Sequence, residues 1–184
     1  MPPYAQTLTH LFALGTVGLQ CIMVAATLHR LWTGTWVPQV LTTHVRTWAL
    51  PLAAVLPVAG LVLSLFYSEV VGLPVCALCW FGRTMMYPLA FIMPIAAWRG
   101  DRDIWRYVLP LATVGAIVSG YQHLLQMGTV TGSACHVIKN SGDCAARYVF
   151  EFDYITMPLF GFTVFVAVAL LVWIARSEAL STHS

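Results

Sequence analysis

The feature that most constrains this chain is a set of long apolar runs that contain almost no charged residues. The clearest run, residues 49–67, holds nineteen residues and no Asp, Glu, Lys or Arg. About 20 apolar residues are needed for a helix to cross a bilayer, so this run predicts a transmembrane helix. The whole sequence of 184 residues is 59% hydrophobic and 9% charged, whereas soluble domains carry roughly 25% charged residues. The chain is therefore predicted to be an integral membrane protein.

Four further apolar runs are long enough to span a membrane, at residues 11–28, 75–98, 107–125 and 156–174. The first ten residues hold no Lys or Arg, so we interpret the run 11–28 as a retained helix and not as a cleaved signal peptide. The fold class predicted from these runs is an all-α membrane bundle of four core transmembrane helices plus one additional N-terminal transmembrane helix.

Basic residues predict how the bundle is oriented. The links 29–48 and 99–106 and the tail 175–184 contain Arg30, Arg46, Arg99, Arg102, Arg106 and Arg176. The opposite side has basic residues only in its long loop, where acidic residues accompany them. The positive-inside rule therefore predicts five spans, with the N-terminus outside and the C-terminus in the cytoplasm. Both pairs of neighbouring cysteines, Cys76 with Cys79 and Cys135 with Cys144, then lie on the outer side.

Cys76 and Cys79 stand where a short polar link gives way to an apolar run. Pro74 ends any helix that arrives from the N-terminal side, so the following residues are expected to begin a new helix. Cys76 and Cys79 then share a helix face, and Arg83 lies one turn beyond Cys79. A helix N-terminus and a guanidinium group both stabilise a thiolate, which is the nucleophilic form of cysteine. This spacing predicts a redox-active dithiol.

Several alternatives remain open at this stage. The four cysteines are able in principle to bind zinc or to hold structure, but eight residues separate Cys135 from Cys144 and a zinc site usually has a closely spaced second pair. No metal is therefore expected. Arg83 inside an apolar span is expected to be functional, unless it extends to the interface. His123 is either a ligand-binding residue or a hydrogen-bonded core residue, and Cys21 is expected to be a small buried side chain.

The net charge of +2 and the lack of a basic run interleaved with aromatic residues give no reason to expect a nucleic-acid partner.

One resemblance becomes specific at this point. The stretch Cys76-Ala-Leu-Cys-Trp-Phe-Gly-Arg-Thr-Met-Met-Tyr-Pro-Leu89 resembles the active site of the DsbB/BdbC family of membrane disulfide bond formation proteins. Residues 121–123, 141–145 and 155–159 resemble later segments of the family in the right order. The resemblance implies a core at residues 49–175 with an outer loop at 126–155, preceded by the extra helix and link at 1–48 and followed by a cytoplasmic tail at 176–184. Gly82 departs from the family, which usually has Gln or Glu before the arginine.

The resemblance implies a thiol oxidase of the bacterial cytoplasmic (inner) membrane. A Cys135–Cys144 disulfide would oxidise a periplasmic, or otherwise extracytoplasmic, thioredoxin-like dithiol protein. The electrons would pass through Cys76 and Cys79 to the membrane quinone pool, with ubiquinone or menaquinone held by the residues Arg83, His123 and Met157. Two rivals are a vitamin K epoxide reductase-like protein, in which the loop cysteines precede the C-x-x-C pair, and a non-catalytic membrane protein whose cysteines bind zinc or are structural.

Overall fold

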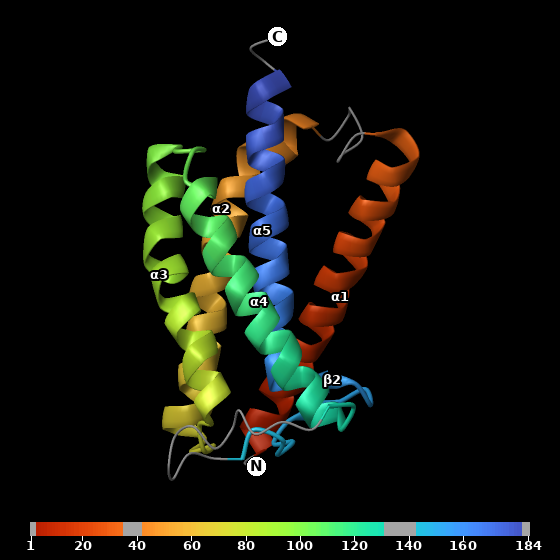
Figure 1. Ribbon diagram of the computed structural model, residues 1–184, viewed down its shortest axis with the longest axis vertical. Coiled ribbons are helices and arrows are strands. Elements are labelled where there is room, and N and C mark those ends of the chain that lie inside the picture. The colour runs from red at the N-terminus through yellow and green to blue at the C-terminus, as the bar shows by residue number, and fades with distance from the viewer. Residues whose placement is uncertain (1–2, 35–41, 131–142, 182–184) are drawn as a thin grey trace.

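The computed structural model describes residues 3–34, 42–130 and 143–181. Its long helices are α1 (Pro3–Thr33), α2 (Thr42–Leu65), α3 (Ala77–Arg99), α4 (Trp105–Met127) and α5 (Met157–Ser181) (Figure 1). A π-helical turn, η1 (Phe66–Val70), continues α2, and the short strands β1 (Phe150–Glu151) and β2 (Ile155–Thr156) form an antiparallel pair before α5. The predicted all-α membrane bundle is confirmed.

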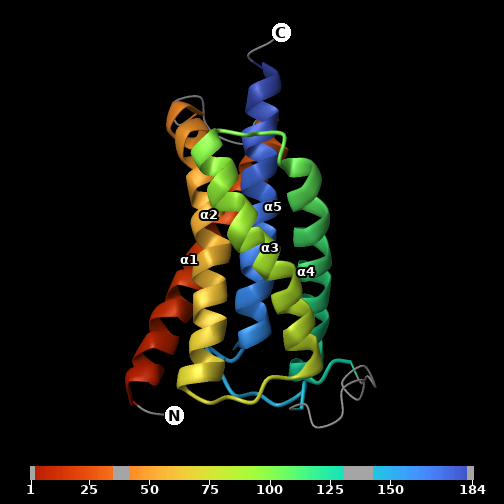
Figure 2. The same cartoon turned by 90° about the vertical axis from the view of Figure 1, so that its left-hand side faces the viewer.

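Four segments of the described chain are long and apolar enough to cross a membrane, at residues 3–33, 47–70, 105–127 and 157–176. The helix α3 is less apolar because it contains Arg83 and two prolines, Pro88 and Pro94. It has the same length as α4, 23 residues, and it runs through the bundle beside α2 and α4 (Figure 2). The protein is a multi-pass membrane protein.

The helices extend beyond the predicted spans. Arg46 belongs to α2 and not to a link, and Gln126 belongs to α4 and not to the outer loop. Polar residues that follow an apolar run continue the backbone hydrogen bonding of the helix, so helix ends lie outside the apolar region. The ends of α3 and α4 are set instead by Gly100 and Gly128, which adopt the left-handed conformation that stops a helix.

The core lies between α2, α3, α4 and α5. Its largest fully buried side chain, Phe165 of α5, faces Gly115 of α4. A Cβ atom at Gly115 would lie 2.4 Å from ring atoms of Phe165, so only glycine permits this approach of the two helices. The same cluster contains Ala53, Ala54, Met86, Leu89, Met93, Val108, Ala112, Val168 and Val172.

The two ends of the bundle are formed by different segments of the chain. The N-terminus, the link before α3 and the segment 143–156 lie at one end, and the turn before α4 and the C-terminus lie at the other (Figures 1 and 2). The helix α1 is tilted against the bundle, and its buried residues, Ala5, Thr9 and Ala13, all lie in its N-terminal half. Cys21 is exposed. The expectation that it is buried was wrong, because Cys21 lies on a side of α1 that the other helices do not cover.

Candidate functional site

Cys76 and Cys79 begin the helix α3, as the sequence predicts. Cys76 is the N-cap residue, and its sulfur accepts a hydrogen bond from the backbone N–H of Cys79 at 3.3 Å. The two sulfur atoms are 2.7 Å apart, and both residues are free thiols in this structure. Cys79 lies in the first helical turn, where the unpaired N–H groups favour negative charge. The pair is thus placed to exchange between dithiol and disulfide, with Cys79 as the favoured thiolate.

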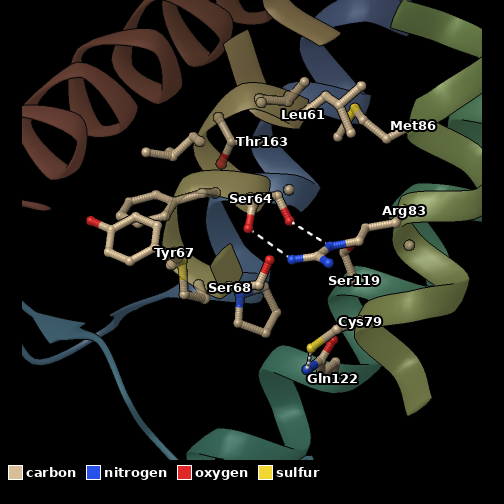
Figure 3. A pocket seen from close by; sticks show the side chains of 18 of the residues that line it. Leu61, Ser64, Tyr67, Ser68, Cys79, Arg83, Met86, Ser119, Gln122 and Thr163 are labelled. Carbon is tan, nitrogen blue, oxygen red and sulfur yellow. Dashed lines mark hydrogen bonds between the residues drawn. The ribbon is translucent and has the colours of Figure 1, made fainter. Parts of the chain in front are cut away.

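Gln122 of α4 contacts both sulfurs. Its Nε2 donates to Cys79 Sγ (Figure 3) and to Cys76 Sγ, each at 3.1 Å. The Gln122 side chain is buried. An amide N–H donor stabilises a thiolate more than a thiol. The sequence analysis included Gln122 only within the segment 121–123, which resembles a later segment of the family. The signal available in the sequence was a polar residue within an apolar span.

Arg83 is turned into the bundle and is only 7% exposed. Its guanidinium therefore bonds within the bundle, which favours the functional interpretation over an extension to the interface. Its Nε donates to Ser64 Oγ at 2.9 Å and its Nη2 donates to the Ser64 carbonyl oxygen at 2.7 Å (Figure 3). The remaining nitrogen, Nη1, is buried and has no hydrogen-bond partner among the described residues. A buried donor without a partner is costly, so this atom marks a place for an acceptor group.

Cys144 lies beside the Cys76 end of the pair. It is fully buried in a small cluster with Cys76, Leu78 and Leu125. Gln126 of α4 holds the segment after Cys144 by donating from Nε2 to the Ala146 carbonyl oxygen at 3.0 Å. Three of the four predicted catalytic cysteines are therefore brought together. The fourth, Cys135, lies outside the described residues.

A cavity of about 370 Å³ adjoins the dithiol. Its lining comes from all five helices and is mostly apolar, with Cys76, Cys79 and Arg83 on the α3 side and Met157 on the α5 side. His123 does not line the cavity. Its Nδ1 is 2.8 Å from Thr156 Oγ1, directly before Met157 in the chain. Of the three residues expected to hold a quinone, the structure brings Arg83 and Met157 to one cavity and places His123 outside the lining, against Thr156.

The same region of the chain matches a known family. The sequence model described as "Disulfide bond formation protein DsbB" matches residues 46–175. The chain belongs to the DsbB family. Among its relatives, it is 32% identical to the "Probable disulfide formation protein C 2" of Bacillus anthracis over 132 residues, which cover 72% of this chain and 93% of that protein. It is 31% identical to the "Disulfide bond formation protein C" of Bacillus subtilis (strain 168) over 72% of this chain and 91% of that protein. No solved structure matches it.

The DsbB family assignment makes this chain a disulfide-forming membrane oxidoreductase, and it favours this class over the vitamin K epoxide reductase-like alternative. The match begins within α2 and ends within α5, so the whole of α1 lies outside it. Among residues 3–34, 42–130 and 143–181, no group of three or more His, Cys, Asp or Glu side chains is arranged to hold a metal ion.

Proposed function

We propose that this DsbB-family protein oxidises an extracytoplasmic thioredoxin-like dithiol protein and transfers the electrons to a membrane quinone. The observation that carries the proposal is the position of the dithiol, which opens on a largely apolar cavity beside the unpaired Nη1 of Arg83. A lipid-soluble acceptor with a carbonyl oxygen suits both features. The quinone, when bound, takes up the two electrons and two protons that a dithiol loses as it becomes a disulfide.

In this proposal the partner protein meets the outer loop first. A partner thiolate attacks Cys135 of a Cys135–Cys144 disulfide and releases Cys144 as a thiolate. The second partner thiol attacks the mixed disulfide, which releases the oxidised partner and the Cys135 thiol. The assignment of Cys135 to the partner rests on the family resemblance, and a partner without its second cysteine is expected to remain bound to Cys135.

Cys144 is proposed to return the disulfide to the loop through Cys76. The Cys144 thiolate attacks Cys76 of a Cys76–Cys79 disulfide, and Cys79 leaves as a thiolate. Cys135 then attacks Cys144, which re-forms the loop disulfide and releases Cys76. The burial of Cys144 in one cluster with Cys76 supports this order of attack. The Gln122 donor and the N-terminus of α3 make Cys79 a good leaving group.

Three residues are proposed to serve the acceptor. Arg83 Nη1 donates a hydrogen bond to its carbonyl oxygen, and Met157 supplies an apolar contact in the cavity wall. His123 acts as a positioning residue, because its bond to Thr156 fixes the backbone directly before Met157. Together these residues hold an acceptor close to Cys79 and exclude water from it.

The proposed location is the cytoplasmic membrane of a bacterium, with the cysteine end of the bundle outside. At the opposite end, Arg99 ends α3, Arg102 lies in the turn that follows, and Arg106 lies in the first turn of α4. Arg30 of α1 and Arg176 of α5 lie near the same end of the bundle. The positive-inside rule assigns that end to the cytoplasm.

The deciding experiment mixes the purified protein with a reduced thioredoxin-like dithiol protein and either ubiquinone or menaquinone. We expect one quinol for each disulfide formed in the partner, and no quinol with the Cys79→Ser variant. Failure of both quinones to be reduced would overturn the proposal. Bound zinc released together with thiol groups would instead support the non-catalytic alternative.

A further inference from the structure

The helix α1 forms a wall of the cavity that the DsbB match does not cover. Four of its residues line the cavity: Phe12, Gly15, Thr16 and Leu19. Their spacing of three, one and three residues places them on one face of the helix, over a length of about 10 Å. Phe12 and Leu19 make the two ends of this stripe apolar.

Two hydrogen bonds hold α1 in this position, one on each side of the stripe. Thr9 Oγ1 bonds to the hydroxyl of Tyr67, and both side chains are buried. Further along the helix, Gln20 Nε2 donates to Thr163 Oγ1 of α5 at 2.9 Å. Polar pairs between membrane helices fix how the helices face one another. The wall is therefore attached to α5 and to η1, the turn that continues α2, and Tyr67 and Thr163 themselves line the cavity (Figure 3).

The middle of the stripe is open. A Cβ atom added at Gly15 would meet no heavy atom within 4 Å. Glycine in a helix is less favourable than alanine by about 1 kcal/mol, and no close packing requires it here. The missing side chain leaves free space beside the cavity on the side of α1, opposite the polar side with Arg83.

We propose that α1 is the wall that binds the apolar tail of the quinone, with Phe12, Gly15, Thr16 and Leu19 as its contact surface. This role rests on the proposed function, and it adds a specificity-determining element from outside the family core. The acceptor ring belongs beside Arg83 and Cys79, and the hydrocarbon tail passes Gly15 along the stripe. α1 then sets the affinity for long-tailed quinones and leaves the exchange between cysteines unchanged.

The test compares Gly15→Leu with Gly18→Leu. Gly18 lies in the same helix, does not line the cavity, and likewise has no heavy atom within 4 Å of an added Cβ. Leucine favours a helix more than glycine does, so both variants are expected to fold.

We expect Gly15→Leu to raise the KM for a long-tailed ubiquinone about tenfold, equivalent to the lost burial of roughly two methylene groups. The KM for a tail-free ubiquinone, and the quinone-independent oxidation of the partner, should stay unchanged. Gly18→Leu should match the wild type.

A second readout does not depend on turnover. An azido-quinone with a photoreactive group on its tail is cross-linked to the protein, which is then digested with trypsin. We expect the label in the peptide that ends at Arg30, and we expect Gly15→Leu to lose it. Labelling confined to peptides after Arg46, or equal KM values in the two leucine variants, would overturn the role of α1 while quinone reduction stands. A wild-type protein that reduces no quinone would overturn the proposed function and this role with it.

Discussion

Ser64 binds the guanidinium of Arg83 at two points, through its hydroxyl at 2.9 Å and its backbone carbonyl at 2.7 Å. The serine belongs to α2 and the arginine to α3, so the contact joins two helices that both line the cavity. It also leaves Nη1 as the one guanidinium nitrogen that is buried without a partner among the described residues. Ser64 thus supplies the polar support that Gly82 does not provide.

The first prediction concerns Ser64. Ser64→Ala removes the hydroxyl acceptor and keeps the backbone carbonyl, so Arg83 remains in place with one bond fewer. A hydrogen bond to a charged group contributes about 1.5–3 kcal/mol, and part of this is retained. We expect the quinone KM to rise several-fold with little change in kcat. Thr84→Ala is the matched control, because this exposed hydroxyl bonds only to the Trp80 carbonyl of its own helix.

The second prediction concerns Arg83 itself. Arg83→Met keeps much of the side-chain volume and removes every donor. If Arg83 acts mainly in the transition state, the loss of a charge-assisted hydrogen bond slows quinone reduction roughly 10–150-fold. Arg99→Met, in the exposed last turn of the same helix, should behave as the wild type. Steady-state kinetics of the folded proteins decide the matter. Unchanged quinone kinetics in Arg83→Met would leave the arginine with a structural role only.

The positions of the helices and of the dithiol were predictable from the sequence. Apolar length predicts spans directly, and Pro74 followed by the C-x-x-C spacing predicts a helix that begins at the cysteines. These features depend on neighbouring residues in the chain, so sequence alone was enough to find them.

The partners across helices were not predictable in the same way. In a soluble protein the apolar face of a helix identifies its buried side, but a membrane helix is apolar on all faces. The sequence therefore did not reveal that Ser64 faces Arg83, that Gln122 faces both sulfurs, or that Cys21 faces away from the bundle. The cavity and its α1 wall were unpredictable for the same reason, because both depend on how the helices are rotated against each other.

The third prediction tests Gln122. Gln122→Leu preserves the approximate size and removes the donor to both sulfurs, so a thiolate at Cys79 loses stabilisation. We expect the alkylation of reduced Cys79 by iodoacetamide near neutral pH to slow by about five- to tenfold, from the loss of roughly 1–1.4 kcal/mol. Mass spectrometry of the Cys79 peptide gives the rate. Leu124→Ala, on the exposed side of α4, serves as the control. A Cys79 rate equal to the wild-type rate would contradict a role for the amide.

The fourth prediction tests the orientation. In a cysteine-free variant, single cysteines replace the exposed residues Gln6 and Asp103, which lie at opposite ends of the bundle. A membrane-impermeant maleimide applied to intact cells (spheroplasts where an outer membrane is present) is expected to label position 6. Position 103 should react only after permeabilisation, because the positive-inside rule, applied to the arginines around it, assigns this end to the cytoplasm. Labelling at 103 without labelling at 6 would reverse the topology.

The fifth prediction follows from the burial of Cys144 with Cys76. The double variant Cys79→Ser, Cys135→Ser keeps Cys76 and Cys144, which lie in one cluster. Each of these two cysteines has lost the cysteine nearest to it in the sequence. Mild oxidation is expected to join them in a disulfide, since both side chains are buried in that cluster. Mass spectrometry without reduction identifies the linked peptides.

The matched control for this disulfide is the variant Cys76→Ser, Cys135→Ser, which keeps Cys79 and Cys144. Cys76 and Cys144 are both buried members of the cluster, whereas Cys79 is a partly buried residue that packs against it, so Cys79 should link to Cys144 more slowly than Cys76 does. A faster link through Cys79 would assign the exchange with the loop to that residue and would reverse the order of attack proposed for the relay. Linkage of Cys144 to the exposed Cys21 in preference to Cys76 would remove the basis for the relay.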